Sequence, residues 1–171
     1  MTNIMKTIKI EKITLNIGAG KDQNKLNKGI KLIKNITGIN PIKTITNKRI
    51  PAWNLRPGLP IGCKLTLRGK KAKEVLKQLF GAKSNEIKAG QFDENGNLSF
   101  GIHEYIDIPG IKYDPEIGII GLQVCITLKR PGYRVNKRKI MKRKINNKHK
   151  ITKQEAIDFI KKEYNVKVEG E

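Results

Sequence analysis

The side chains with the clearest chemistry in this sequence are lysine, arginine and small polar residues set in alternation with apolar ones. Two stretches, residues 12–17 and 63–68, carry this pattern. Their polar members are Lys12, Thr14, Asn16, Lys64, Thr66 and Arg68. Alternate residues of an extended strand share one face, so each stretch presents a basic and polar surface. Cations bind phosphates, while Thr and Asn reach sugars and base edges. The pattern therefore predicts binding of nucleic acid.

The net charge favours the same kind of partner. The 171 residues include 36 Lys and Arg against 15 Asp and Glu, a formal net charge of +21. Self-repulsion of this size disfavours a free globular protein, and a polyanion relieves it. A membrane surface is the other polyanion, but no unbroken apolar run reaches the ~18 residues of a spanning helix. Charged residues from Lys6 to Lys12 also interrupt any signal-peptide core. We expect a soluble cytoplasmic protein with no membrane and no small-molecule substrate.

The charges are segregated along the chain. No acidic residue occurs from 23 to 73 or from 117 to 154, and the acids gather between 86 and 116. The charges of a long basic run repel one another unless an anion neutralises them. The basic run at residues 129–150 therefore indicates an RNA-binding arm. The acidic stretch is either a solvated face or a face for a basic partner.

Motifs for catalysis are incomplete. Gly18–Gly20 follows a predicted strand but lacks the third glycine and the acidic ribose partner of a dinucleotide site. Gly69–Lys71 lacks the first glycine and the hydroxyl of a phosphate-binding loop. The acidic pair Asp93–Glu94 precedes Asn95-Gly96, a strong turn signal, so a solvated turn is expected there. His103 has no nucleophile motif beside it. We therefore predict a protein that is not an enzyme.

The cysteines and histidines show no metal-binding spacing. Cys63 and Cys125 lie far apart, and His103 and His149 are the only histidines. We expect no metal and no cofactor. Each cysteine lies within an apolar strand pattern, which predicts two buried, reduced thiols.

Periodicity predicts an α+β fold. Helices are expected after Asp22, with the apolar stripe Leu26, Ile30, Ile33 and Ile36, and from Ala72 to Gly81. About five strands are expected, at residues 11–17, 42–46, 63–68, 98–102 and 122–128. Neighbouring strands are mostly not separated by helices, so we predict a mainly antiparallel sheet with helices packed on one face.

The chain changes character after Arg130. We predict a core at residues 1–130 and a basic arm at 131–171 that becomes ordered mainly on RNA. Thr152 and Glu155 have the spacing of a capping box, so the arm should include a short helix.

Several motifs together resemble one known family. The motifs are Asn16–Gly20, Ile36–Gly38 with Pro41, Pro60–Gly69, Phe92–Asn97, Phe100–Ile102, Ile108–Glu116 and Arg130–Tyr133. In this order, and over nearly the whole chain, they resemble the large ribosomal subunit protein five family, in its archaeal branch. The resemblance implies a structural protein that attaches 5S rRNA in the central protuberance, in contact with large-subunit rRNA and other central-protuberance proteins.

The resemblance also implies sites. The expected rRNA-binding residues are Asn16, Lys43, Thr44, Thr46, Lys48, Arg49, Lys64, Thr66, Arg68, Arg134, Lys137, Arg138, Lys139, Lys142, Arg143 and Lys144. A loop expected to contact P-site tRNA contains Trp53, Asn54, Leu55, Arg56, Pro57 and Gly58. Trp53 or Leu55 would stack on tRNA, unless Trp53 folds back on its own core. An intersubunit bridge to small-subunit protein thirteen is expected at Asp107, Pro109, Lys112, Tyr113, Asp114 and Glu116.

Composition alone also permits a general nucleic-acid-compacting protein. Low aromatic content and the absence of helix-turn-helix or zinc patterns disfavour a reader of DNA sequence. An RNA-modifying enzyme has no catalytic constellation to support it.

Overall fold

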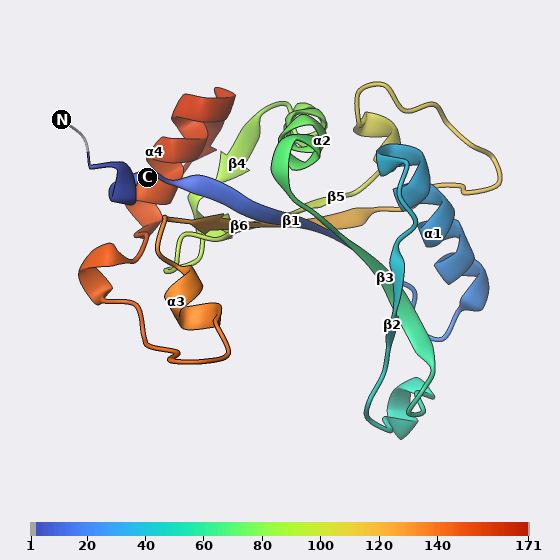
Figure 1. Cartoon of the computed structure of the whole chain (residues 1–171). Coiled ribbons are helices and arrows are strands. Elements are labelled where there is room, and N and C mark those ends of the chain that lie inside the picture. The colour runs from blue at the N-terminus through green and yellow to red at the C-terminus, as the bar shows by residue number, and fades with distance from the viewer. Residues whose placement is uncertain (1–2, 171) are drawn as a thin grey trace.

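The computed structural model describes residues 3–170 and has an antiparallel sheet at its centre (Figure 1). The sheet has five strands in the order β2-β3-β1-β6-β5. Their bounds are β1 (Lys9–Gly18), β2 (Ile42–Ile45), β3 (Pro60–Leu67), β5 (Leu98–Ile102) and β6 (Leu122–Lys129). The predicted fold class is confirmed. A separate pair of short strands, β4 (Glu86–Lys88) and β7 (Lys167–Glu169), runs parallel.

Three helices pack on one side of this sheet, and a fourth is a single turn in the arm. The helices are α1 (Gln23–Thr37), α2 (Gly69–Gly81), α3 (Arg134–Lys137) and α4 (Lys153–Tyr164). Short 3-10 turns lie at Ile4–Lys6, Pro51–Trp53, Ala89–Gln91, Tyr105–Asp107 and Asn147–His149. Asp22 caps α1 by accepting hydrogen bonds from the amides of Asn24 and Lys25, and Gly38 ends it in the left-handed region.

Alternation along the strands creates the core. Ile13, Leu15 and Ile17 of β1 are buried beneath the helices, as are the alternate apolar residues of β3, β5 and β6. The buried face of α1 differs from the prediction, because Leu32 is buried while Ile30 and Ile36 are only half-buried. Gly29 explains the shift. A Cβ there would lie 3.2 Å from Ile17 Cγ2, so the absence of a side chain lets the helix approach the sheet.

The two cysteines lie on opposite faces of the sheet. Cys63 is fully buried, as predicted, and burial raises the pKa of its thiol to about 11. The prediction for Cys125 is wrong, because this residue is exposed. It alternates with the buried Val124 and Ile126, so the same period that buries them turns Cys125 to the other side.

Helix α4 is part of the core. Ile151, Ala156, Ile157 and Ile160 are buried in the same apolar cluster as the sheet. Residues 131–171 are predicted to become ordered mainly on RNA, but α4 within them is held by protein packing. Its apolar stripe was visible in the sequence, whereas the surface that receives it was not. The division into a core at residues 1–130 and an arm at residues 131–171 stays a prediction. Residues 1 and 2 of the core and residue 171 of the arm lie outside the described residues.

The described part of the chain holds neither a membrane-spanning helix nor a group of residues arranged to bind a metal ion. Within residues 3–170, the helices lack the length and apolar character needed to cross a membrane. The same residues contain no group of three or more His, Cys, Asp or Glu arranged to hold a metal ion.

Candidate nucleic-acid interface

One face of the sheet carries polar and cationic side chains from adjacent strands, and α1, α2 and α4 lie on the other side. We call this surface the open face. Its members are Lys12, Thr14, Asn16, Thr44, Lys64, Thr66, Arg68, Ser99, Gln123, Cys125, Thr127 and Lys129. Cross-strand register brings them together, because directly opposed residues of antiparallel strands share a face. Asn16, for example, lies opposite both Lys64 of β3 and Gln123 of β6.

The open face contains five of the predicted rRNA-binding residues: Asn16, Thr44, Lys64, Thr66 and Arg68. The prediction omitted the residues of β5 and β6. The sequence does contain the pattern that identifies them, because the alternation that buries Leu122 and Val124 places Gln123 on the opposite face. The amide of Asn16 donates a hydrogen bond to Gln123 Oε1 at 3.1 Å, so the two side chains form one polar unit. Ile42 lies opposite Lys64 and is exposed, which adds an apolar edge to this surface.

Other predicted rRNA-binding residues lie elsewhere. Lys43 is opposite Cys63, so it points to the helix side of edge strand β2. Thr46 is buried, and its hydroxyl donates to the carbonyl of Lys48 at 3.1 Å. Its role is therefore to shape the chain. Lys48 and Arg49 are exposed in the loop after β2.

Glu11 is an acidic residue at the end of the open face near the arm. Its side chain is 9% exposed, and it pairs with Lys137 of α3 and, at 3.6 Å, with Arg68, the N-cap residue of α2 directly after β3. Burial favours the neutral acid, but Lys137 and the charges of Lys129 and Arg68 outweigh it and hold the pKa of Glu11 below its ordinary value. The carboxylate thus joins three elements and fixes two cations at the surface.

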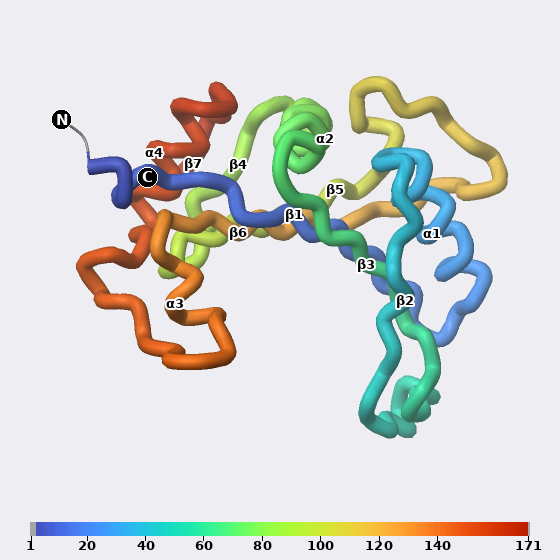
Figure 2. The backbone as a smooth tube through the Cα atoms, in the orientation of Figure 1, coloured from blue at the N-terminus to red at the C-terminus, as the bar shows by residue number. Residues whose placement is uncertain are grey.

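The loop between β2 and β3 projects away from the sheet on the side opposite α2 and α4 (Figure 2). Its tip is ordered by backbone hydrogen bonds between Ile50 and Leu55, at 3.0 and 3.1 Å. Leu55 is buried, so it does not offer a stacking surface. Trp53 is 67% exposed, which excludes the reading that it folds back on the core. Asn54 adopts the left-handed conformation, and the remaining members of the predicted loop, Arg56, Pro57 and Gly58, are exposed.

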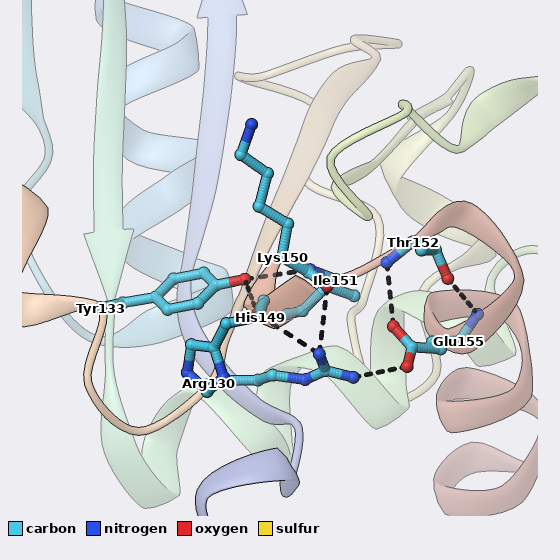
Figure 3. Close-up of polar contacts among 7 residues, drawn as sticks. All are labelled: Arg130, Tyr133, His149, Lys150, Ile151, Thr152 and Glu155. Atoms are coloured by element: carbon cyan, nitrogen blue, oxygen red, sulfur yellow. Dashed lines mark hydrogen bonds and ion pairs between the residues drawn. The ribbon is translucent and has the colours of Figure 1, made fainter. Parts of the chain in front are cut away.

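The basic arm begins at Arg130, directly after β6, and the chain comes back beside Arg130 at His149 and Lys150 (Figure 3). Buried Arg130 donates from Nη1 to the carbonyls of His149 at 3.3 Å and Lys150 at 3.0 Å. From Nη2 it contacts Glu155 Oε1 at 2.6 Å. The Tyr133 hydroxyl donates to the His149 carbonyl and accepts from the Ile151 amide, at 3.3 and 3.0 Å.

These contacts, which we call the arm clamp, hold the two ends of residues 131–150 together. Glu155 also completes the predicted capping box, since Thr152 and Glu155 exchange hydrogen bonds at 3.0 and 3.4 Å. The hydrogen bond from the Thr152 amide and the neighbouring Arg130 guanidinium lower the pKa of Glu155. In the sequence, Arg130 and Tyr133 stand out only as part of a motif. Their role depends on carbonyls about 20 residues away, which no local pattern reveals.

The arm displays its cations outward. Every predicted rRNA-binding residue of the arm is exposed: Arg134, Lys137, Arg138, Lys139, Lys142, Arg143 and Lys144. The arm projects on the same side of the sheet as the β2–β3 loop, and the two flank the open face (Figures 1 and 2). The cations of the arm therefore lie on the same side of the sheet as those of the open face, such as Lys64.

The predicted bridge segment is a folded loop. Tyr105 is buried, and its hydroxyl accepts a hydrogen bond from the Asp114 amide at 2.9 Å. Two of the predicted acids are occupied within the chain, because Asp114 accepts from the Glu116 amide at 3.0 Å and Glu116 pairs with Lys31. Lys31 lowers the pKa of Glu116 through this contact. The exposed members of the prediction are Asp107, Pro109, Lys112, Tyr113 and Glu116.

The fold and this surface define a class of protein: a nucleic-acid-binding α+β protein whose interface is a sheet face with a basic arm. Comparison with known families makes the class specific. Residues 3–56 match the family described as ribosomal protein L5, and residues 60–159 match the model of the C-terminus of the same ribosomal family.

Full-length relatives agree with this match. The chain is 48% identical to large ribosomal subunit protein uL5 of Nanoarchaeum equitans, over 98% of this chain and 99% of the relative. It is 47% identical to that of Sulfurisphaera tokodaii, over 97% and 94%, and 41% identical to that of Methanosphaera stadtmanae, over 98% and 99%.

The chain belongs to the ribosomal protein L5 family. It is a structural constituent of the large ribosomal subunit, and the family is not a family of enzymes.

Proposed function

We propose that the chain binds 5S rRNA through the open face and attaches it to the large subunit in the central protuberance of the cytoplasmic ribosome. The observation that carries this proposal is the open face itself. Five strands bring polar side chains to one uncovered surface, and cations such as Lys64 and Arg68 stand among hydroxyls and amides. Phosphate contacts orient an RNA, while Thr and Asn side chains reach its sugars and bases.

The arm supplies a second attachment. Its exposed lysines and arginines fit phosphates of the large-subunit rRNA, and the arm clamp presents them as a closed loop. In this proposal the core at residues 1–130 binds 5S rRNA and the arm at residues 131–171 binds large-subunit rRNA. This division is compatible with the shared core, because α4 anchors the arm to the sheet.

The β2–β3 loop is proposed to contact P-site tRNA. Trp53 is the side chain that would stack on exposed RNA, with Arg56 pairing to a phosphate. Leu55 instead holds the tip together from inside. An ordered tip loses less conformational entropy on contact than a flexible one does.

The bridge to small-subunit protein thirteen is proposed at the exposed part of the segment 107–116. Asp107, Lys112 and Tyr113 face solvent there, and Glu116 is exposed while paired with Lys31. Exposed charge pairs contribute only about 0–1 kcal/mol each, so a bridge of this kind can exchange partners as subunits move. Other central-protuberance proteins are the remaining proposed neighbours.

The deciding experiment compares binding to 5S rRNA, a size-matched unrelated RNA and duplex DNA across a salt series. All three should show a salt slope of roughly 0.7–0.9 log units per contacted phosphate. We expect 5S rRNA to stay bound at salt concentrations that release the other two. Equal release of all three would indicate general nucleic-acid compaction and overturn the proposal.

A matched pair of double variants then tests the surface. Lys64→Gln with Arg68→Gln removes two charges from the open face, whereas Lys70→Gln with Lys77→Gln removes two from exposed positions of α2 on the helix side. We expect the first pair to weaken 5S rRNA binding by about tenfold or more and reduce the salt slope by roughly one to two. The second pair should leave the 5S preference unchanged. Equal effects would show that only total charge matters.

A further inference from the structure

The arm and the end of the sheet enclose a cleft that the family assignment does not explain. Its volume is about 390 Å³, within the range of sites for small ligands. Glu11 and Thr127 contribute from β1 and β6, and the turn at residues 95–97 closes one side. The turn packs against the arm at Gly96, where an added Cβ would lie 2.7 Å from Ile151 Cγ2. The cleft is therefore built by close packing of three separate parts of the chain.

Amide side chains are unusually frequent in this cleft. Four asparagines line it: Asn95, Asn97, Asn136 and Asn147. An asparagine amide offers two donors and an acceptor, the combination that reads the edge of a nucleobase. Within residues 3–170, the side chains of Asn136 and Asn147 make no hydrogen bond, so both are available to a ligand.

The rest of the lining is cationic and apolar. Lys137, Lys144 and Lys150 line the cleft, and in Figure 3 the side chain of Lys150 extends away from the arm clamp. Glu11 is the one acidic residue of the lining, and Lys137 and Arg68 neutralise it. The remaining charge favours an anion.

Apolar surface comes from Ile145 and Ile151, with Tyr133 beside them. The Tyr133 hydroxyl is engaged in the arm clamp, so its ring is the part left for contact with a ligand. Apolar and aromatic side chains accept the flat face of a base, while amides bind its edge and lysines bind its phosphate.

We propose that this cleft takes up one unstacked nucleotide of the bound RNA, with the base among the asparagines and its phosphate on Lys144 and Lys150. The site deepens the proposed RNA-binding function and rests on it. It adds recognition of a base at a place where the arm otherwise offers only charge. The arm clamp keeps the cleft formed, because it fixes Tyr133 and Ile151 relative to each other.

The test uses the whole chain and free ligands. AMP, CMP, GMP, UMP, ribose 5-phosphate and inorganic phosphate are titrated separately, and binding is followed by NMR or calorimetry. We expect at least one nucleotide to bind saturably and about tenfold or more tighter than ribose 5-phosphate, since the base supplies stacking and hydrogen bonds. Equal binding of nucleotide, ribose 5-phosphate and phosphate would reduce the cleft to an anion site and overturn the proposal. So would absence of saturable binding at millimolar nucleotide.

Variants locate the binding. Asn136→Ala with Asn147→Ala should weaken nucleotide binding by about tenfold and leave phosphate binding unchanged. Asn27→Ala, an exposed amide on α1 far from the cleft, is the matched control and should have no effect. Equal nucleotide affinities of the cleft variant and the control variant would refute the assignment of the site. If the cleft variant does not fold, the wild-type affinities for nucleotide, ribose 5-phosphate and phosphate decide whether the cleft binds a base.

The 5S rRNA salt series separates this inference from the proposed function. Retained 5S preference without nucleotide binding rejects the cleft alone. Nucleotide binding in the cleft without 5S preference rejects the proposed function alone.

Discussion

Replacing Arg130 with methionine tests whether the arm is held by its clamp. Methionine keeps an apolar stem of similar length but removes the donors to the His149 and Lys150 carbonyls and the contact with Glu155. A hydrogen bond to a charged group contributes about 1.5–3 kcal/mol. The Glu155 side chain is 43% exposed, so water takes over much of that contact and it is discounted. The two carbonyl contacts then give an expected loss of about 3 kcal/mol in the free energy of unfolding.

Two assays measure this. Urea unfolding gives the free energy, and limited proteolysis reports opening of residues 131–150, which should be cut faster in Arg130→Met. Arg143→Met, at an exposed arm position, is the matched control and should change stability by less than about 0.5 kcal/mol. If both variants unfold alike and the arm is cut at the wild-type rate, the clamp does not hold the arm and the reasoning is wrong.

Three further predictions follow from other residues. Exposed Cys125 should react with a thiol reagent in the native protein, whereas buried Cys63 should react only on unfolding, because burial raises the pKa of its thiol to about 11. Bound 5S rRNA should shield Cys125 from the reagent. If RNA leaves the labelling of Cys125 unchanged, the RNA binds elsewhere. Gly62→Ala puts a Cβ 2.7 Å from a backbone carbonyl of β1 and should cost about 1–3 kcal/mol in urea unfolding, whereas Gly101→Ala meets open space and should be nearly neutral. The pKa of Glu155 is lower in the folded protein than its ordinary value of about 4.3, so its contribution to stability is complete above that value and is lost as the pH falls through the folded pKa. Acid unfolding of Glu155→Gln should lack this part of the pH dependence. If the variant and the wild type show the same pH profile, Glu155 does not make this contribution.

The sequence predicted those parts of the fold that depend on local periodicity. Alternation identified the strands and the polar face, so Lys64 and Thr66 were placed together correctly. Capping residues located the starts of α1 and α4, since Asp22 and Thr152 cap them by local hydrogen bonds.

The remainder depends on contacts between distant parts of the chain. Lys43 and Thr46 were expected at the interface, but strand register and a local turn decide where they point. The arm clamp joins Arg130 to backbone carbonyls, which carry no sequence signal. Leu55 is buried within its own loop, and composition does not distinguish that arrangement from an exposed one.

The position of β1 in the sheet has a consequence for how the protein is made. This strand lies in the centre of the sheet, yet its neighbours β3 and β6 come later in the chain, and Ile13 pairs with Ile126. During synthesis β1 emerges before both partners, with its hydrogen-bonding groups and its apolar residues unpaired. Unpaired strand edges favour aggregation, and long-range pairing slows folding. The growing chain is also strongly cationic and adheres to any RNA it meets. Until β6 is complete, β1 therefore stays without one of its two partner strands and open to aggregation.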